Sequence, residues 1–200
     1  MNLNPPIEQH PLTPFIPEGC RLMMFGSFPP PIDKWSMEFF YPNWINDMWR
    51  IMGIVFHRDA HYFELPQAKC FDRQKIVDFC QTKGIGLYDT ATKVRRLEGN
   101  ASDKFLEVVE PTNIASLLNQ APSCNIIVTT GEKASDIIAE QFACAKPKIG
   151  DYTKIKFNNR TLLFYRMPSS SRAYPLALQN KADYYKRLFS ACGLLEFHIV

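Results

Sequence analysis

The sequence lacks the features of a membrane protein and of a secreted, disulfide-bonded protein. No run approaches the ~18 consecutive apolar residues that a membrane-spanning helix needs. The amino-terminal segment MNLNPPIEQHPLTPF has neither the basic stretch nor the apolar stretch of a signal peptide. The six cysteines are scattered and form no C-x-x-C pair, which disfavours a disulfide framework and a cysteine metal site. We therefore expect a cytoplasmic globular protein with buried, reduced thiols.

A strong charge and a metal-ligand pattern are also missing. The formal net charge of +3 permits nucleic-acid binding without requiring it. Basic residues cluster at Lys93–Arg96 and at Lys181, Lys186 and Arg187, and each cluster alone is more typical of a solvated surface than of a phosphate site. The histidines at positions 10, 57, 61 and 198 show no ligand spacing. We assign them no role and expect neither a metal nor a cofactor.

The sequence does contain enough apolar residues for one domain of ordinary size. Its 200 residues are 46% hydrophobic and 22% charged, so a core can form without disulfides or metals. Residues 1–19 carry five prolines and little periodicity, which predicts an extended amino-terminal arm. Residues 20–200 show no internal repeat and no second domain, so they are interpreted as a single α/β domain.

Short apolar segments alternate with amphipathic ones along this domain, and a parallel sheet with helices on both faces is the expected result. Strands are predicted over 20–26, 84–90 and 124–130, and a hairpin is predicted from 154–157 and 162–165. Helices are predicted near 44–53, 73–82, 112–120, 132–143 and 177–191. For the second helix, Asp72 is the expected cap and Gly84 the expected end. Positions 54–71 look irregular, and 93–107 is a charged stretch.

Three loops follow predicted strands and should meet at one edge of the sheet: Gly26–Pro31, Tyr88–Thr92 and Met167–Arg172. Ligands of parallel α/β sheets bind at this edge. Prolines stiffen the first loop, because they fix φ and cannot donate to a ladder. Aromatic and amide side chains follow it, in the stretch FFYPNWIND, and they suit a flat polar ligand such as a nucleobase.

These same loops carry a family resemblance. GSFPP followed by FYPNWINDMW resembles the first motif of the uracil-DNA glycosylase superfamily, closest to the hypoxanthine (deoxyinosine) DNA glycosylase branch, which reads roughly GSFPG and then YYxHPRNxFW. GIGLYDTATKVRR is similar to the second block of that branch, and RMPSSSRAYP to its carboxyl-terminal motif. The likeness runs over about residues 20–190. It implies a monomer with a three-layer α/β/α sandwich around a central, mainly parallel four-stranded sheet.

The activity that the resemblance implies is base excision repair by a monofunctional DNA glycosylase. Such a hydrolase cleaves the N-glycosidic bond of a deaminated base, hypoxanthine or uracil, that is flipped out of double- or single-stranded DNA. One alternative is a uracil or G·U-mismatch specialist. Another is a nucleic-acid-binding homologue with weak catalysis, because Phe28 and Met167 stand where stronger relatives place a water-activating acid or amide and a histidine.

Asn46 is the candidate catalytic residue, because it falls on the asparagine of the family's HPRN segment, where it would position water. The alternative for Asn46 is an amide that caps the following helix. Asn43, which replaces the family histidine, is the second choice. The full set of candidate base-binding residues is Ser27, Phe28, Phe40, Tyr41, Asn43 and Asp89.

Two kinds of contact to the base are expected from this set. Phe40 and Tyr41 are candidates for stacking, although one of the two is expected to be core. An ionised Asp89 would accept a hydrogen bond from N1–H of hypoxanthine or N3–H of uracil. The alternative for Asp89 is a cap of the following turn.

The last motif is the candidate DNA-binding loop, because the family loop it resembles presses on the DNA strand. Compact backbone and hydroxyl groups can donate to phosphates, and Arg172 can hold a phosphate or fill the vacated stack. The residues assigned to DNA binding are Pro168, Ser169, Ser170, Ser171 and Arg172. Since Met167 replaces the histidine that stabilises the departing uracil anion in the strongest enzymes, we predict modest uracil activity.

Overall fold

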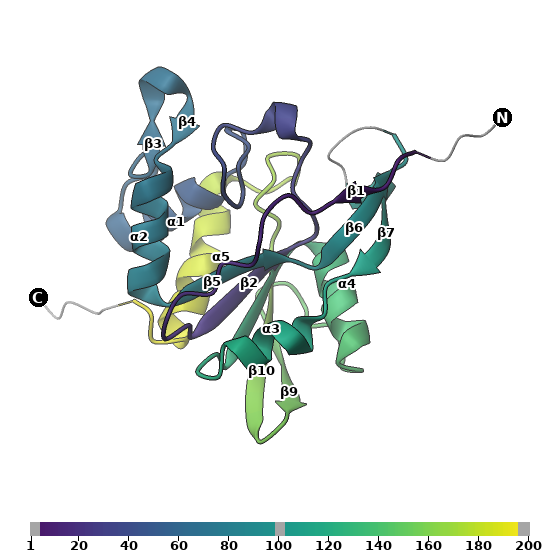
Figure 1. Cartoon of the computed structure of the whole chain (residues 1–200). Coiled ribbons are helices and arrows are strands. Elements are labelled where there is room, and N and C mark those ends of the chain that lie inside the picture. Colours follow the sequence, from purple (N-terminus) through teal and green to yellow (C-terminus); the bar gives the residue numbers. More distant parts are fainter. Residues whose placement is uncertain (1–4, 99–102, 196–200) are drawn as a thin grey trace, which may run out of the picture.

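The computed structural model describes residues 5–98 and 103–195, and a five-stranded sheet lies at its centre, in the order β5-β2-β8-β10-β9 (Figure 1). Four strands are parallel, as predicted: β5 (Ile85–Asp89), β2 (Leu22–Gly26), β8 (Ile126–Thr130) and β10 (Arg160–Met167). The fifth strand, β9 (Tyr152–Phe157), forms the predicted hairpin with β10. The predicted four-stranded sheet therefore has one further, antiparallel edge strand.

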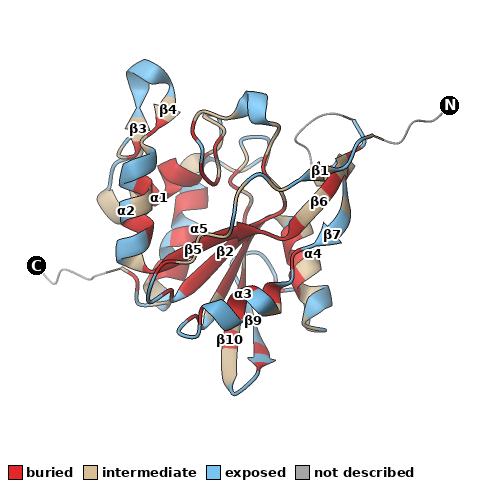
Figure 2. Ribbon diagram, in the orientation of Figure 1, coloured by how far each residue is buried: buried red, intermediate tan, exposed pale blue. Residues whose placement is uncertain are grey.

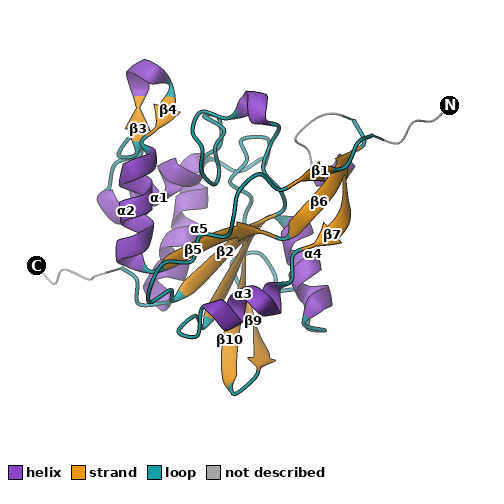
Figure 3. Cartoon of the chain, in the orientation of Figure 1, coloured by secondary structure: helices purple, strands orange, loops and turns teal. Residues whose placement is uncertain are grey.

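Helices cover both faces of this sheet, so the predicted three-layer α/β/α arrangement is confirmed (Figures 1 and 3). One layer contains α1 (Met48–His57), α2 (Arg73–Lys83) and α5 (Leu178–Ala191). The ring of Phe56 joins them, because its centroid lies 5.0 Å from that of Phe79 in α2 and 4.9 Å from that of Phe189 in α5. The other layer contains α3 (Ile114–Gln120) and α4 (Glu132–Gln141).

Local signals fix the ends of two of these helices. Asp72 Oδ1 accepts the Lys75 N–H at 3.1 Å, and Gly84 ends α2 at φ +65°, both as predicted. The prediction for α1 was four residues early. Asn43 and Asn46 instead accept backbone N–H groups two residues ahead, from Ile45 and Met48, and these turns delay the helix to Met48.

The charged stretch 93–107 folds into a hairpin that the sequence pattern did not predict. Strand β6 (Ala91–Arg96) pairs with β7 (Leu106–Pro111), and β1 (Glu8–Gln9) adds a third strand. Cross-strand ion pairs replace the usual apolar alternation, for example Lys93–Glu110 at 2.7 Å.

The stretch 54–71 likewise contains a short hairpin, β3 (Glu64–Leu65) and β4 (Cys70–Phe71). Single 3-10 turns lie at η1 (Ile32–Lys34), η2 (Pro66–Ala68) and η3 (Asp103–Phe105).

The amino-terminal arm runs antiparallel along β5 and β6. Phe15 and Leu87 exchange backbone hydrogen bonds of 3.0 and 2.8 Å, and the His10 N–H donates to the Thr92 carbonyl at 2.8 Å. The arm therefore covers the edge of β5, which would otherwise present unpaired backbone groups. Residues 1–4 of the predicted arm, and 99–102 and 196–200 of the predicted domain, lie outside the described residues.

The central strands form the core of the protein. Every residue of β2 and of β5 is buried, and the red strands of Figure 2 pass through the middle of the molecule. Their apolar sequences are consistent with strands covered on both faces. Across residues 5–98 and 103–195, no helix is both long and apolar enough to cross a membrane.

Candidate active site

The carboxyl ends of the four parallel strands lie level with one another. The register pairs Gly26 with Asp89 and Met167 with Thr130. The following residues are joined across the strands, since Thr90 donates its N–H and its hydroxyl to the Gly26 carbonyl at 2.9 and 3.1 Å. The three loops that were expected to share an edge do share it, and the loop after β8 joins them.

Asp89 is buried at this edge and lies directly over Gly26. A Cβ on Gly26 would collide with Asp89 Oδ1, so the carboxylate occupies the space that the missing side chain leaves. Asp89 Oδ2 is hydrogen-bonded to His10 Nε2 at 2.9 Å. Asp89 is thus held at the end of β5 by groups from two other segments.

His10 is a site residue that the sequence analysis missed. Its side chain is 2% exposed and lies among aromatic rings, with centroids 4.6 Å from Tyr88 and 5.2 Å from Phe28. When Nε2–H donates to Asp89, Nδ1 can accept the Leu12 N–H at 3.1 Å. A protonated ring would instead donate from Nδ1 to the Leu12 carbonyl at 2.9 Å. No local pattern links His10 to Asp89, because 79 residues separate them.

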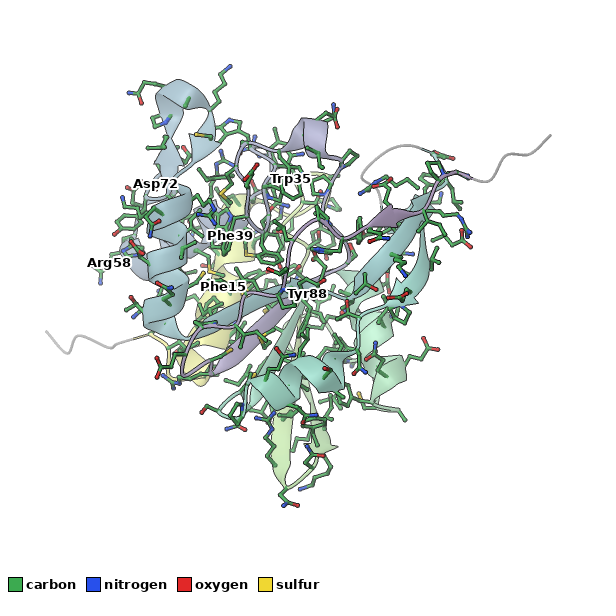
Figure 4. The ribbon with its side chains drawn as sticks, viewed as in Figure 1. Phe15, Trp35, Phe39, Arg58, Asp72 and Tyr88 are labelled. Carbon is green, nitrogen blue, oxygen red and sulfur yellow. The ribbon has the colours of Figure 1, made fainter. Side chains whose placement is uncertain are left out.

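The two candidates for base stacking differ in their surroundings. Phe40 is only 4% exposed and packs edge-on against Phe39 and Tyr88, which are labelled in Figure 4. Tyr41 is only partly buried and has φ +51°, a conformation that costs a non-glycine residue energy. Its hydroxyl lies 3.2 Å from Thr130 Oγ1, so it reaches the strand ends. Burial, and then the charge of Asp89, raise the pKa of Tyr41 and keep it protonated.

Ser27 and Phe28 follow β2 and contact different groups of the β6–β7 region. Ser27 Oγ donates to Asp103 Oδ1 at 2.5 Å, whereas Phe28 packs against the small core of the β6–β7 hairpin. Burial raises the pKa of the Asp103 carboxyl above its ordinary value. The hydrogen bond from Ser27 and the charge of Lys133 act in the opposite direction. Asp103 is the second site residue that sequence analysis missed, because it stands in a charged stretch without a motif.

Asn43 and Asn46 lie in the turns that precede α1. The Met48 N–H donates to Asn46 Oδ1 at 2.9 Å, so the capping alternative for Asn46 is present in the structure. Arg50 holds this segment in place, because its guanidinium donates hydrogen bonds to the carbonyls of Trp44 and Asn46 at 2.8 and 3.0 Å. No hydrogen bond joins the Asn46 side chain to Ser27 or Asp89 within the part of the chain that the structure describes. The catalytic role of Asn46 stays a prediction.

An ion-pair cluster joins α1, the loop after β10 and α5. Asp47 accepts hydrogen bonds from Lys181 Nζ at 2.9 Å and from Arg172 Nε at 3.0 Å. Lys181 also donates to the Ser171 carbonyl at 2.8 Å. Lys181 is 1% exposed, so its interpretation as part of a solvated basic surface is wrong: Asp47 compensates its burial.

The loop Pro168–Arg172 is held mainly through its backbone. The Pro168 carbonyl accepts the Tyr185 hydroxyl at 3.0 Å, and the Ser170 carbonyl accepts the Asp47 N–H at 2.9 Å. The hydroxyls of Ser169 and Ser171 accept backbone N–H groups two residues ahead. Arg172 keeps a half-exposed side chain beside this fixed loop.

No group of three or more His, Cys, Asp or Glu side chains that could hold a metal ion occurs in residues 5–98 and 103–195. The groups that gather at the strand ends are a buried carboxylate (Asp89), a partly buried one (Asp103), an imidazole, and serine and tyrosine hydroxyls. This set can accept hydrogen bonds from a polar ring, orient water and take up a proton.

Comparison with known proteins identifies the fold. No protein-family model and no curated protein matches the chain. Among solved structures, it is similar to the NMR structure of a "putative Uracil DNA glycosylase" from Methanosarcina acetivorans, with a TM-score of 0.61 and 18% identity, over 94% of this chain and 99% of that chain. The chain has the fold of the uracil-DNA glycosylases. At 18% identity this likeness concerns the fold alone.

Proposed function

We propose that this protein is a monofunctional DNA glycosylase that hydrolyses the N-glycosidic bond of hypoxanthine or uracil flipped out of DNA. The observation that carries the proposal is the meeting of Ser27, Asp89 and the loop 168–172 at the carboxyl edge of the sheet. These are the loops that resemble the glycosylase motifs. The name of the Methanosarcina protein, which has the same fold, supports the same class of activity.

Base recognition is assigned to Asp89. Its carboxylate can accept the N1–H of hypoxanthine or the N3–H of uracil, whereas adenine and cytosine present an acceptor at that position. His10 donates to the same carboxylate and thereby fixes its orientation. We therefore assign His10 a positioning role. We assign to Tyr41 the contact with the face of the base.

Asn46 remains our candidate for holding the attacking water. Its Oδ1 already accepts the Met48 N–H, and an amide oxygen has a second lone pair that can accept from water. The same hydrogen bond fixes the side chain, which is a requirement for positioning a reactant.

DNA binding is assigned to the loop 168–172 and above all to Arg172, whose guanidinium is half exposed. We expect base release without strand scission, which would need an unprotonated lysine amine as nucleophile. Lys133 and Lys181 approach this edge, but Lys133 donates to the Leu106 carbonyl and Lys181 to Asp47.

One observation favours the second candidate function, a nucleic-acid-binding protein with weak catalysis. Phe28 stands where relatives place a water-activating acid or amide, and its ring packs against the β6–β7 hairpin. Such a protein would bind abasic DNA, with an affinity that falls as salt rises, and would not turn over.

The deciding experiment is single-turnover cleavage of labelled duplexes that each contain one hypoxanthine, uracil or xanthine. Treatment with alkali reveals abasic sites, and a parallel sample without alkali tests for strand scission. Product from one duplex only after alkali would support the monofunctional glycosylase and identify its base. No product from any duplex, together with tight binding to abasic DNA, would favour the binding protein.

A further inference from the structure

Asp103 lies close to residues that follow three of the parallel strands. Its Oδ1 accepts the Ser27 hydroxyl, which comes after β2. A Cβ built on Gly131, after β8, would lie 3.9 Å from Asp103 Oδ2 and 3.9 Å from the Cβ of Ser169, after β10. A methyl group on Gly131 would therefore fit in ordinary van der Waals contact between a carboxylate oxygen and the candidate DNA-binding loop.

The groups that face this carboxylate come from four elements. Ser27 donates a hydrogen bond, while Lys133 of α4 and Arg96 of β6 attract its negative charge and Asp89 of β5 repels it. Burial outweighs the attractive groups, so the pKa of Asp103 is raised. A carboxylate with a raised pKa is a better proton acceptor than an exposed one, provided that it is ionised at the working pH.

The two carboxylates of the site have different partners. Asp89 is bonded to the imidazole of His10, whereas Asp103 accepts a hydrogen bond from the neutral hydroxyl of Ser27. Different surroundings for two acids at one site indicate different tasks. The apolar Phe28 directly follows Ser27 and cannot activate water, so a general base has to come from another segment.

We propose that Asp103 is the general base of this site, contacting the attacking water beside Ser27 and Gly131. This inference rests on the proposed glycosylase activity. In the step, the water oxygen forms a bond to C1′ of the deoxyribose while the bond from C1′ to the base nitrogen breaks. The bonding electron pair leaves with the base, and Asp103 takes the proton that the water loses. The products are the free base and an abasic site.

The test compares Asp103→Asn with Asp136→Asn, which removes the same charge from an exposed position on α4. Asparagine keeps the oxygen that accepts from Ser27 but cannot take a proton. We expect the single-turnover rate of Asp103→Asn to fall by about 10²-fold or more, while that of Asp136→Asn stays at the wild-type level. The wild-type rate should rise with pH as Asp103 ionises, and this rise should be missing in Asp103→Asn.

A third variant and a stability measurement separate this role from a structural one. Ser27→Ala removes the bond that lowers the pKa of Asp103, so the rise in rate should move to higher pH. The stability that a raised carboxyl pKa contributes is present below the ordinary value and is lost as pH rises through the folded value. Relative to wild type, Asp103→Asn should therefore have an equal or higher Tm at neutral pH, and this difference should shrink toward pH 4.

Three outcomes would overturn the inference. If wild type releases a base and Asp103→Asn keeps both its rate and its pH profile, Asp103 is not the base, and the glycosylase activity stands. If Asp103→Asn lowers the Tm at neutral pH and only slows a reaction that keeps its pH profile, the role of Asp103 is structural. If wild type releases no base from any duplex, the proposed function fails and the inference fails with it.

Discussion

The two sides of the candidate site use buried polar groups in opposite ways. On one side, which we call the anchored side, Asp47 is paired with Lys181 and Arg172, and the amides of Asn43 and Asn46 hold turns. Each buried charge there has an opposite charge within hydrogen-bond distance. Such pairs fix the geometry of loops, whatever their net contribution to stability.

On the other side, the carboxylate side, Asp89 is buried and Asp103 is partly buried, and their bonded partners are an imidazole and a serine hydroxyl. Burying a carboxylate away from water is unfavourable unless hydrogen bonds or charges compensate it. Titratable groups held away from water in this way are typical of sites that carry chemistry. The comparison teaches that the anchored side positions the loops and the carboxylate side is where protons and base edges are expected to be bound.

The largest effect should come from breaking the anchored side. Asp47→Ala would leave the buried ammonium of Lys181 without its carboxylate, and the free energy of unfolding should fall by about 3–5 kcal/mol. Urea denaturation would measure this loss. Asp183→Ala, at an exposed position on α5, is the control and should change little. A double change to Asp47→Leu with Lys181→Met should recover most of the loss, and equal effects of Asp47→Ala and Asp183→Ala would contradict the account.

Substitutions of Asn46 test whether its amide only holds a turn or also positions water. Asn46→Ala should lower turnover by about 10²-fold if its amide positions water, and far more than it lowers DNA affinity. It should also cost ~1 kcal/mol of stability, because it removes the oxygen that accepts from Met48. Asn46→Ser keeps a good capping group, so it should recover stability but not turnover. Recovery of both by serine would mean that Asn46 acts only by holding its turn and does not position water.

On the carboxylate side, a substitution of His10 tests whether this residue orients Asp89. His10→Ala removes the donor to Asp89, and a buried acceptor without its partner should reduce stability by about 1–3 kcal/mol. The discrimination between hypoxanthine and adenine should narrow, because Asp89 would lose its fixed orientation. His61→Ala is the matched control for base discrimination, since it removes a similar imidazole–carboxylate bond, to the side chain of Glu64 (4% exposed), at a position outside the candidate site. If His10→Ala discriminates between hypoxanthine and adenine as well as wild type does, His10 does not position Asp89.

Arg172 should show the smallest effect. Its side chain is half exposed, so Arg172→Ala should cost little stability. DNA affinity should weaken for all sequences alike, and the slope of log affinity against log salt should decrease by about 1. Titration of labelled duplex at several salt concentrations measures this slope. A slope equal to that of wild type would mean that Arg172 does not contact a phosphate.

The parallel strands and most helices could be predicted because their signals are local. LMMF in β2 and IIV in β8 are apolar at consecutive positions, which indicates strands buried on both faces. Asp72 and Gly84 mark the ends of one helix. The β6–β7 hairpin was missed because charged residues such as Lys93 and Glu110 dominate its sequence, and its small core of buried residues consists of Ala91, Val94 and Leu106. Alternation of apolar and polar residues does not reveal cross-strand ion pairs such as Lys93–Glu110.

The layers of this protein, and the edge of the sheet at which its loops meet, follow from local patterns, because periodicity, capping and turn residues act over a few positions. Which polar groups face one another at that edge depends on the packing of the whole fold. His10 reaches Asp89 across 79 residues, Ser27 reaches Asp103 across 76, and Asp47 reaches Lys181 across 134. Contacts at such separations depend on how whole elements pack, and no spacing within one segment encodes them.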